Sequence, residues 1–132
     1  MSTFTSKATV NKPIQEVYQF LADMNNHQQL MPEGVTEWQS TDDAASFKVQ
    51  NMITLKLKFG EKAENSLIKI IPAEAPPFDL GLTWQLTPAN GSTHVFYTIS
   101  AELNMMMKMM ASGPLQKLAD HEVSTLAKVL SV

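Results

Sequence analysis

The clearest chemical signal in the sequence is a carboxylate, Glu122, that interrupts an apolar stripe near the end of the chain. At about 100° per residue, one side of a helix collects four apolar residues: Leu115, Leu118, Leu126 and Val129. Glu122 falls close to the centre of the same side. A buried carboxylate either finds a partner or has a raised pKa, and such groups serve as general acids or bases or orient a ligand. Glu122 is therefore the candidate catalytic and ligand-binding residue, although a contact with solvent or with a structural lysine or tyrosine is an equal alternative.

Other chemistries find little support in the sequence. His27, His94 and His121 lie far apart, and none has a second histidine or carboxylate at metal-ligand spacing, so we expect no metal site. The glycines are isolated and there is no cysteine, which excludes phosphate loops and thiolate chemistry. We expect no cofactor. The lack of any histidine or basic residue predicted to point inward weakens the case for an enzyme.

Composition limits the class of protein further. The 132 residues are enough for one domain, which we expect to span residues 1–132. The net charge is −3, and all ten basic residues are lysine, which argues against nucleic-acid binding. No apolar run is long enough to cross a membrane, and the N-terminal residues lack the pattern of a signal peptide. We therefore expect a cytoplasmic protein.

The pattern of apolar residues predicts a strand, two short helical segments, six further strands and a long helix. The first strand covers residues 3–10, a helix follows Pro13 to Ala22, and one more turn covers His27 to Met31. The later strands are predicted at residues 35–39, 46–50, 53–59, 67–71, 80–86 and 93–103. Asn90-Gly91 is a strong signal for a tight hairpin turn.

This order of elements is similar to that of the START-like, or SRPBCC, superfamily. The residues that carry the resemblance are Ala8 to Pro13, Val17 to Asp23, Leu30 to Pro32 before Val35, and Gly113 to Leu115. The resemblance implies an α+β helix-grip fold, in which a seven-stranded antiparallel sheet wraps around a long C-terminal helix, with two short helices after the first strand. It also implies an apolar cavity. Because such proteins differ widely in activity, the resemblance implies no particular reaction.

A methionine-rich segment precedes the last helix. Five of the six residues from Met105 to Met110 are methionine, and Gly113-Pro114 is predicted to separate this segment from a helix that runs from Pro114 to Val132. In a meander of strands, the segment shares one end of the sheet with the Asn51-Met52 and Pro72 to Asp79 connections. Methionine adapts to varied apolar partners. We therefore interpret Asn104 to Gly113 as a lid over a cavity, with core packing and an exposed patch for a protein or membrane surface as alternatives.

The alternation of each strand predicts which residues face the interior. The inward residues are expected to be Phe47, Val49, Leu55, Leu57, Phe59, Ile68, Ile70, Leu82, Trp84, Leu86, Val95, Tyr97, Ile99 and Ala101. Trp84 and Tyr97 stand out because a buried aromatic with a polar atom needs a partner. The residues proposed to contact a ligand are Phe47, Leu57, Phe59, Leu82, Trp84, Tyr97, Met106, Met110, Leu118 and Glu122.

These residues favour a protein that binds a small hydrophobic or amphipathic molecule between the sheet and the C-terminal helix. Two alternatives stay open. One is an enzyme of the polyketide cyclase, dehydratase or hydrolase kind that uses Glu122 in the same cavity. The other is an interaction protein that docks a partner or a membrane surface through Met105 to Met110.

Overall fold

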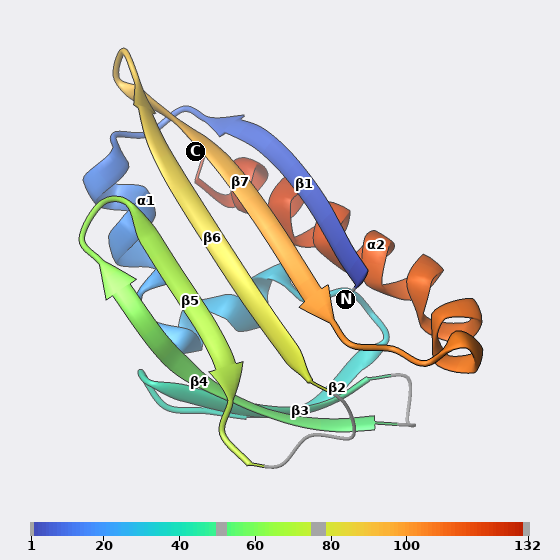
Figure 1. Cartoon of the computed structure of the whole chain (residues 1–132). Helices are drawn as coiled ribbons and strands as arrows, with labels where there is room; N and C mark the ends of the chain where they lie inside the picture. Colours follow the sequence, from blue (N-terminus) through green and yellow to red (C-terminus); the bar gives the residue numbers. More distant parts are fainter. Residues whose placement is uncertain (1, 50–52, 75–78, 131–132) are drawn as a thin grey trace.

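The computed structural model describes residues 2–49, 53–74 and 79–130, and it shows a curved sheet packed against one long helix (Figure 1). The strands are β1 (Ser2–Val10), β2 (Val35–Ser40), β3 (Ala44–Val49), β4 (Ile53–Ala63), β5 (Leu67–Pro72), β6 (Leu80–Ala89) and β7 (Ser92–Ala101). The helices are α1 (Ile14–Leu21), the 3₁₀ helix η1 (Met24–Leu30) and the long α2 (Met105–Val129). This is the helix-grip α+β fold that the sequence predicts.

The sheet has seven antiparallel strands in the order β1-β7-β6-β5-β4-β3-β2. Strands β2 to β7 form a meander, and the N-terminal strand β1 completes the sheet beside β7, with Ser2 opposite Ala101. The chain leaves β3, β5 and β7 at the same end of the sheet, and α2 begins at that end (Figure 1). This confirms the prediction that the connections after β3, β5 and β7 lie at one end of the sheet. The parts of these connections at Asn51-Met52 and Pro76 to Phe78 lie outside the described residues.

The alternation predicted for the strands is confirmed. In β7, Val95, Tyr97 and Ile99 are buried, whereas Phe96 between them is 40% exposed. The residues predicted to face inward all belong to the hydrophobic core or pack against it. Asn90 and Gly91 have positive φ angles of 51° and 86°, as the predicted hairpin turn requires.

Several strand boundaries differ from the prediction: β3 begins at Ala44 instead of residue 46, β6 continues to Ala89 instead of residue 86, and the ends of β4 and β7 also differ. The segment from Gly60 to Ala63 was expected to be a loop because of its polar residues, but β4 continues through it to Ala63. A shift in register between Phe59 and Lys62 accommodates the polar run without ending the strand. In β7, regular pairing ends at Ala101 instead of Leu103, and residues 102–104 lead directly into the helix.

The predicted helix break at Gly113-Pro114 is wrong, because α2 is continuous from Met105 to Val129 with Pro114 inside it. A proline removes one backbone hydrogen bond from a helix interior. Gly113 and Pro114 are both exposed, so water can reach the freed carbonyl group at this point. The Asn104 side chain caps the helix by accepting a hydrogen bond from the Met107 amide at 2.8 Å. The methionines therefore belong to the first turns of α2.

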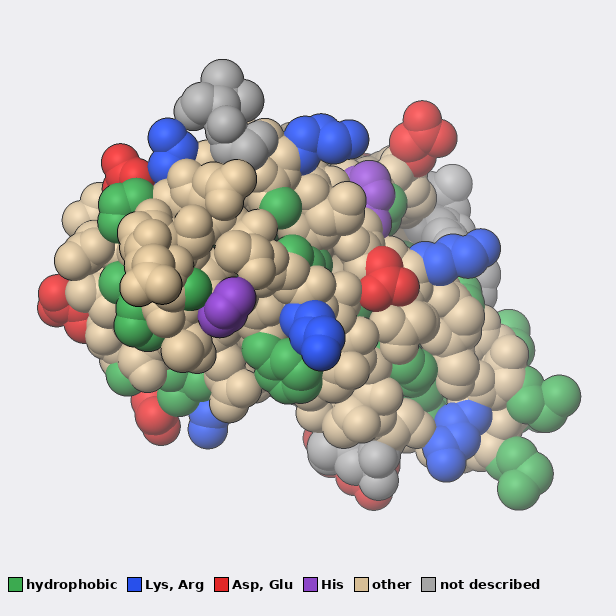
Figure 2. Space-filling view, turned by 90° about the horizontal axis from the view of Figure 1, so that it is seen from above, with side chains coloured by type: hydrophobic (Ala, Val, Ile, Leu, Met, Phe, Trp, Pro, Cys, Tyr) green, Lys and Arg blue, Asp and Glu red, His purple; other side chains and the backbone are tan. Residues whose placement is uncertain are grey.

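These methionines do not fill the core. Met105, Met106, Met109 and Met110 are 82%, 72%, 84% and 61% exposed. Hydrophobic side chains project at one end of the molecule in Figure 2. The interpretation of the segment as core packing is therefore wrong, and an exposed patch at the start of α2 takes its place.

Candidate functional site

The carboxyl group of Glu122 is buried against the sheet, as the helical stripe predicts. Only 2% of Glu122 is exposed, and the neighbouring residues on α2, Asp120 and His121, face outward. Burial raises the pKa of Glu122 from its ordinary value of 4.5 to about 8. The side chain is therefore mostly protonated at pH 7, and its carboxylic acid group is able both to donate and to accept a hydrogen bond.

Tyr97 of β7 lies in electrostatic contact with Glu122. Burial raises the pKa of the Tyr97 phenol well above its ordinary range, and the nearby Glu122 raises it further, while Tyr97 in turn lowers the pKa of Glu122. Among the described residues, the Tyr97 hydroxyl nevertheless has no partner with hydrogen-bond geometry. The two groups thus interact at close range without an aligned bond. The buried indole Nε1 of Trp84 on β6 likewise has no hydrogen-bond partner in the part of the chain that the structure describes.

His27 is a site residue that the sequence reasoning missed. It belongs to η1, it is only 2% exposed, and burial lowers the pKa of its imidazole below 6.5. Its Nε2 lies 2.8 Å from the carbonyl oxygen of Leu21 at the end of α1. Because a carbonyl group only accepts hydrogen bonds, Nε2 carries the proton in the neutral ring, and Nδ1 is left as an acceptor. The expectation that no histidine points inward is therefore wrong.

Aromatic contacts connect His27 to the neighbourhood of Glu122. The His27 ring lies edge-on to both Phe59 and Trp84, with centroid distances of 6.2 Å in each case. The Trp84 ring stacks on Tyr97 at 3.9 Å. This row crosses β4, β6 and β7 and ends at the tyrosine that interacts with Glu122. His27 and Glu122 are thus connected through a continuous set of buried side-chain contacts.

His27 and Glu122 line the same inner cavity, which has a volume of about 40 Å³. The other lining residues are apolar: Met24, Met31, Trp38, Phe47, Leu55, Leu57, Ile70, Leu80, Leu82, Ile99, Leu115 and Leu118. They come from η1, the sheet and α2. One carboxylic acid and one neutral imidazole therefore line the same, otherwise apolar cavity.

The residues proposed from the sequence as ligand contacts are not all at this cavity. Five line it: Phe47, Leu57, Leu82, Leu118 and Glu122. Phe59, Trp84 and Tyr97 pack behind it in the aromatic row. Met106 and Met110 are exposed and line neither this cavity nor the outer one described below. Met24, Met31 and Trp38 were not predicted as site residues: Met24 and Met31 lie in a segment without clear periodicity, and Trp38 lies in a predicted strand whose inward face was not assigned.

His27 also has a structural role. Its hydrogen bond to Leu21 satisfies a carbonyl group at the end of α1 and so fixes η1 against that helix. Asp23 begins η1 by accepting a hydrogen bond from the Asn25 amide at 3.0 Å. The position of the imidazole is therefore set by the local fold, whether or not a ligand occupies the cavity.

Within the described ranges, no group of histidine and acidic residues has the arrangement of a metal site. No helix in that part of the chain is long and apolar enough to cross a membrane.

Comparison with known proteins identifies the fold. No protein-family model matches the sequence, and no curated protein matches it. Solved structures do: KanY has a TM-score of 0.82 at 14% identity, with 99% of this chain and 98% of that chain covered. A START superfamily protein from Mycobacterium smegmatis has a TM-score of 0.72 at 14% identity, covering 97% of this chain and 96% of that one. The Aha1 dimer from Colwellia psychrerythraea gives 0.70 at 14%, covering 100% and 98%. The chain has a START/SRPBCC-like fold, and at these identities the likeness concerns the fold alone.

Proposed function

We propose that this protein binds a small, largely apolar molecule that carries a hydrogen-bonding group, in the space between the sheet and α2. The observation that supports this most directly is the carboxylic acid of Glu122 in an apolar cavity, with a pKa of about 8. An acid buried only to complete a core is costly compared with an apolar residue. A ligand that exchanges hydrogen bonds with Glu122 would offset that cost.

The inner cavity is smaller than the ligand pockets of most proteins, which measure about 300–1,000 Å³. At about 40 Å³ it holds a few water molecules at most. Binding therefore requires side chains to move. Methionine side chains such as those of Met24 and Met31 adopt several conformations, and Leu82, Leu115 and Leu118 are only partly buried. Changes in the conformations of these side chains would enlarge the cavity.

The test uses the neutral fluorescent probe N-phenyl-1-naphthylamine, together with native mass spectrometry of the purified protein to detect a bound molecule. We expect the probe to bind with an increase in fluorescence. Leu118→Trp should fill the cavity and weaken binding at least ten-fold. Leu130→Trp is the matched control, since Leu130, the residue that caps the C-terminus of α2, is another partly buried leucine and does not line the cavity. Equal affinities of the two variants, or no binding by the native protein, would contradict the proposal.

A second candidate is an enzyme that uses the same cavity. It is favoured by the opposite pKa changes of the two lining groups, raised for Glu122 and lowered for His27. A neutral carboxylic acid is suited to donate a proton, and the Nδ1 atom of a neutral imidazole is suited to accept one, as in a dehydration or cyclisation. A panel of β-hydroxyacyl and β-ketoacyl thioesters would serve as substrates. Turnover should be lost in Glu122→Gln while probe affinity is retained, and unchanged turnover would remove Glu122 from this role.

A third candidate is docking of a protein or a membrane surface through the exposed patch of Met105, Met106, Met109 and Met110. Exposed apolar patches of this kind often mark interaction sites. The double variant Met106→Glu/Met110→Glu should abolish sedimentation with phospholipid vesicles or capture of a partner. His121→Glu, at an exposed position farther along α2, is the control. The cytoplasmic location expected from the sequence stays a prediction.

A further inference from the structure

Among the described residues, β5 and β6 are not paired at the end of the sheet where α2 begins. In that part of the chain their pairing covers only Leu67–Ile70 and Leu82–Gln85. Beyond this point β5 stays with β4, since Pro72 is opposite Leu57, while β6 stays with β7 down to Leu80. Among the described residues, no ladder pairing joins the two halves of the sheet below Ile70 and Leu82. Figure 1 shows the two strands diverging there.

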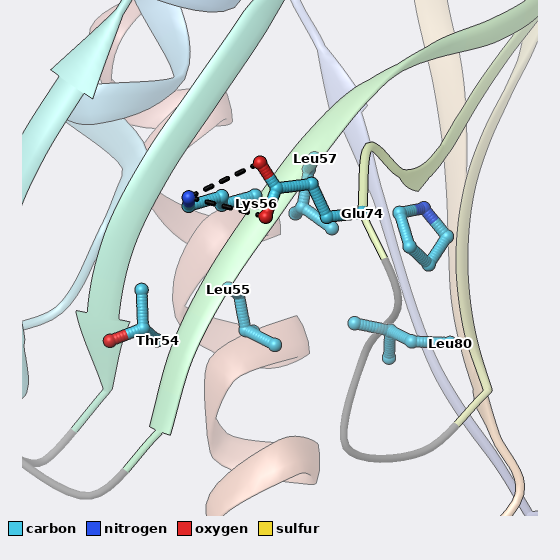
Figure 3. A pocket seen from close by; sticks show the side chains of 7 residues that line it. Thr54, Leu55, Lys56, Leu57, Glu74 and Leu80 are labelled. Carbon is cyan, nitrogen blue, oxygen red and sulfur yellow. Dashed lines mark hydrogen bonds and ion pairs between the residues drawn. The ribbon is translucent and has the colours of Figure 1, made fainter.

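An outer cavity of about 320 Å³ lies in this opening. Three of its lining residues, Leu55, Leu57 and Leu80, also line the inner cavity that contains Glu122. These leucines therefore stand between the two spaces. Figure 3 shows Leu55 of β4 and Leu80 of β6 pointing toward one another across the gap. Movement of these side chains would connect the two cavities.

Within the described residues, the rim of the outer cavity carries one ion pair, between Lys56 and Glu74. The Lys56 Nζ lies 3.3 Å from Oε1 and 3.2 Å from Oε2 of Glu74, and the two side chains are 47% and 66% exposed (Figure 3). An exposed pair of this kind contributes only about 0–1 kcal/mol, so another anion is able to replace Glu74. Lys48 of β3 is diagonal to Lys56, since it pairs with Thr54, and it adds positive charge. Asp79 adjoins Leu80 but does not line the cavity.

We infer that ligands reach the inner cavity through this opening between β4 and β6, and that they carry an anionic group that binds Lys56 in place of Glu74. The inference rests on the proposed function and adds to it the class of ligand and the route. The apolar body of such a molecule passes Leu55 and Leu80 toward Glu122, while its anionic end stays at the rim. The outer cavity supplies the volume that the inner one lacks. The methionines at the start of α2 line neither space and take no part.

The charge is tested with two probes that differ by one sulfonate group, 1-anilinonaphthalene-8-sulfonate and N-phenyl-1-naphthylamine. Lys56→Gln should weaken binding of the sulfonate probe about five-fold, a change of about 1 kcal/mol. Glu74→Gln should strengthen it, because it removes the competing carboxylate. Neither variant should alter binding of the neutral probe. Lys58→Gln is the matched control, since Lys58 is the next outward lysine of β4 and does not line the cavity.

The route is tested by stopped-flow measurement of association with the neutral probe. Leu80→Trp should narrow the gap and slow association at least five-fold, and Leu80→Ala should speed it. Met106→Glu/Met110→Glu should leave the rate unchanged. The charge variants are at exposed positions, so they test the inference even where a Leu80 variant fails to fold.

The possible failures are distinguishable. If the native protein does not bind the neutral probe, the proposed function fails. If the probe binds and Leu118→Trp blocks it, but Lys56→Gln and Glu74→Gln behave like Lys58→Gln, only the anionic class of ligand is overturned. If Leu80 variants leave association unchanged and the methionine variant alters it, the route through the sheet is overturned.

Discussion

The burial of Glu122 makes the stability of the protein depend on pH in a specific direction. Its folded-state pKa is about 8, compared with an ordinary value of 4.5 in an unfolded chain. Between these values the folded protein holds a proton that the unfolded chain has released. The free energy of unfolding therefore falls as pH rises, by at most about 1.4 kcal/mol per pH unit. Over the whole interval the loss is about 5 kcal/mol.

The burial of His27 makes the free energy of unfolding rise with pH, opposite to the effect of Glu122. This difference sets the pH window in which the effect of Glu122 is best measured. The folded-state pKa of His27 is lowered below 6.5, so its contribution to stability is complete above pH 6.5 and is lost as pH falls below that value. Tyr97, with its pKa raised well above 10, does not titrate below pH 8. Of these three groups, Glu122 changes the stability most between pH 6.5 and 8. With a pKa of about 8, the expected loss across this window is about 1.5 kcal/mol.

The test is urea denaturation of the native protein and of Glu122→Gln at pH 6.5, 7, 7.5 and 8. Glutamine has nearly the same shape and cannot ionise. The difference between the two proteins cancels the other titrating groups, and it should change by about 1.5 kcal/mol in favour of the variant as pH rises. A difference that stays constant would mean that Glu122 ionises in the folded protein as it does in the unfolded chain. The assignment of a buried acid would then be refuted.

Three further substitutions test other parts of the structure. Tyr97→Phe removes a buried hydroxyl that has no aligned partner among the described residues. Because this hydroxyl lowers the pKa of Glu122, the pKa of Glu122 should rise further in a carbon-13 NMR titration of the variant, and the stability should change by less than about 1 kcal/mol. A fall in the pKa of Glu122 would contradict the contact between the two side chains. Pro114→Ala should stabilise the protein by about 1–3 kcal/mol in urea denaturation if α2 is continuous, whereas a neutral effect would indicate a helix that begins at Pro114. Asn104→Ala should cost about 1 kcal/mol in the same assay through loss of the cap, and unchanged stability would argue against a helix start at Met105.

The inner face of the sheet and the burial of Glu122 were predictable because both follow from regular periodicity. Trp84 and Tyr97 occupy alternate positions on their strands, and that alternation decides which side they face. Glu122 shares the side of α2 that packs on the sheet, so the helical period placed it although its chemistry is polar.

His27 was not predictable in the same way. It belongs to a short 3₁₀ helix whose sequence has no apolar period, and its burial results from the folding of η1 onto Phe59 and Trp84. The gap between β5 and β6 was also not predictable from the sequence. It depends on where β5 and β6 stop pairing, and strand propensity does not determine that register. The prediction of a helix break at Pro114 was wrong, because α2 continues through the proline despite the hydrogen bond that proline removes.

The pairing of β1 with β7 has a consequence for how the chain folds. Strands β2 to β6 each pair with the next strand along the chain, so these contacts close short loops and are able to form early. The pairing of β1 is delayed, because its partner β7 is distant in the sequence: Ser2 pairs with Ala101 and Val10 with Thr93. Such distant contacts slow folding. On the ribosome the first strand emerges long before its partner is made, and we expect it to join the sheet in one of the last steps.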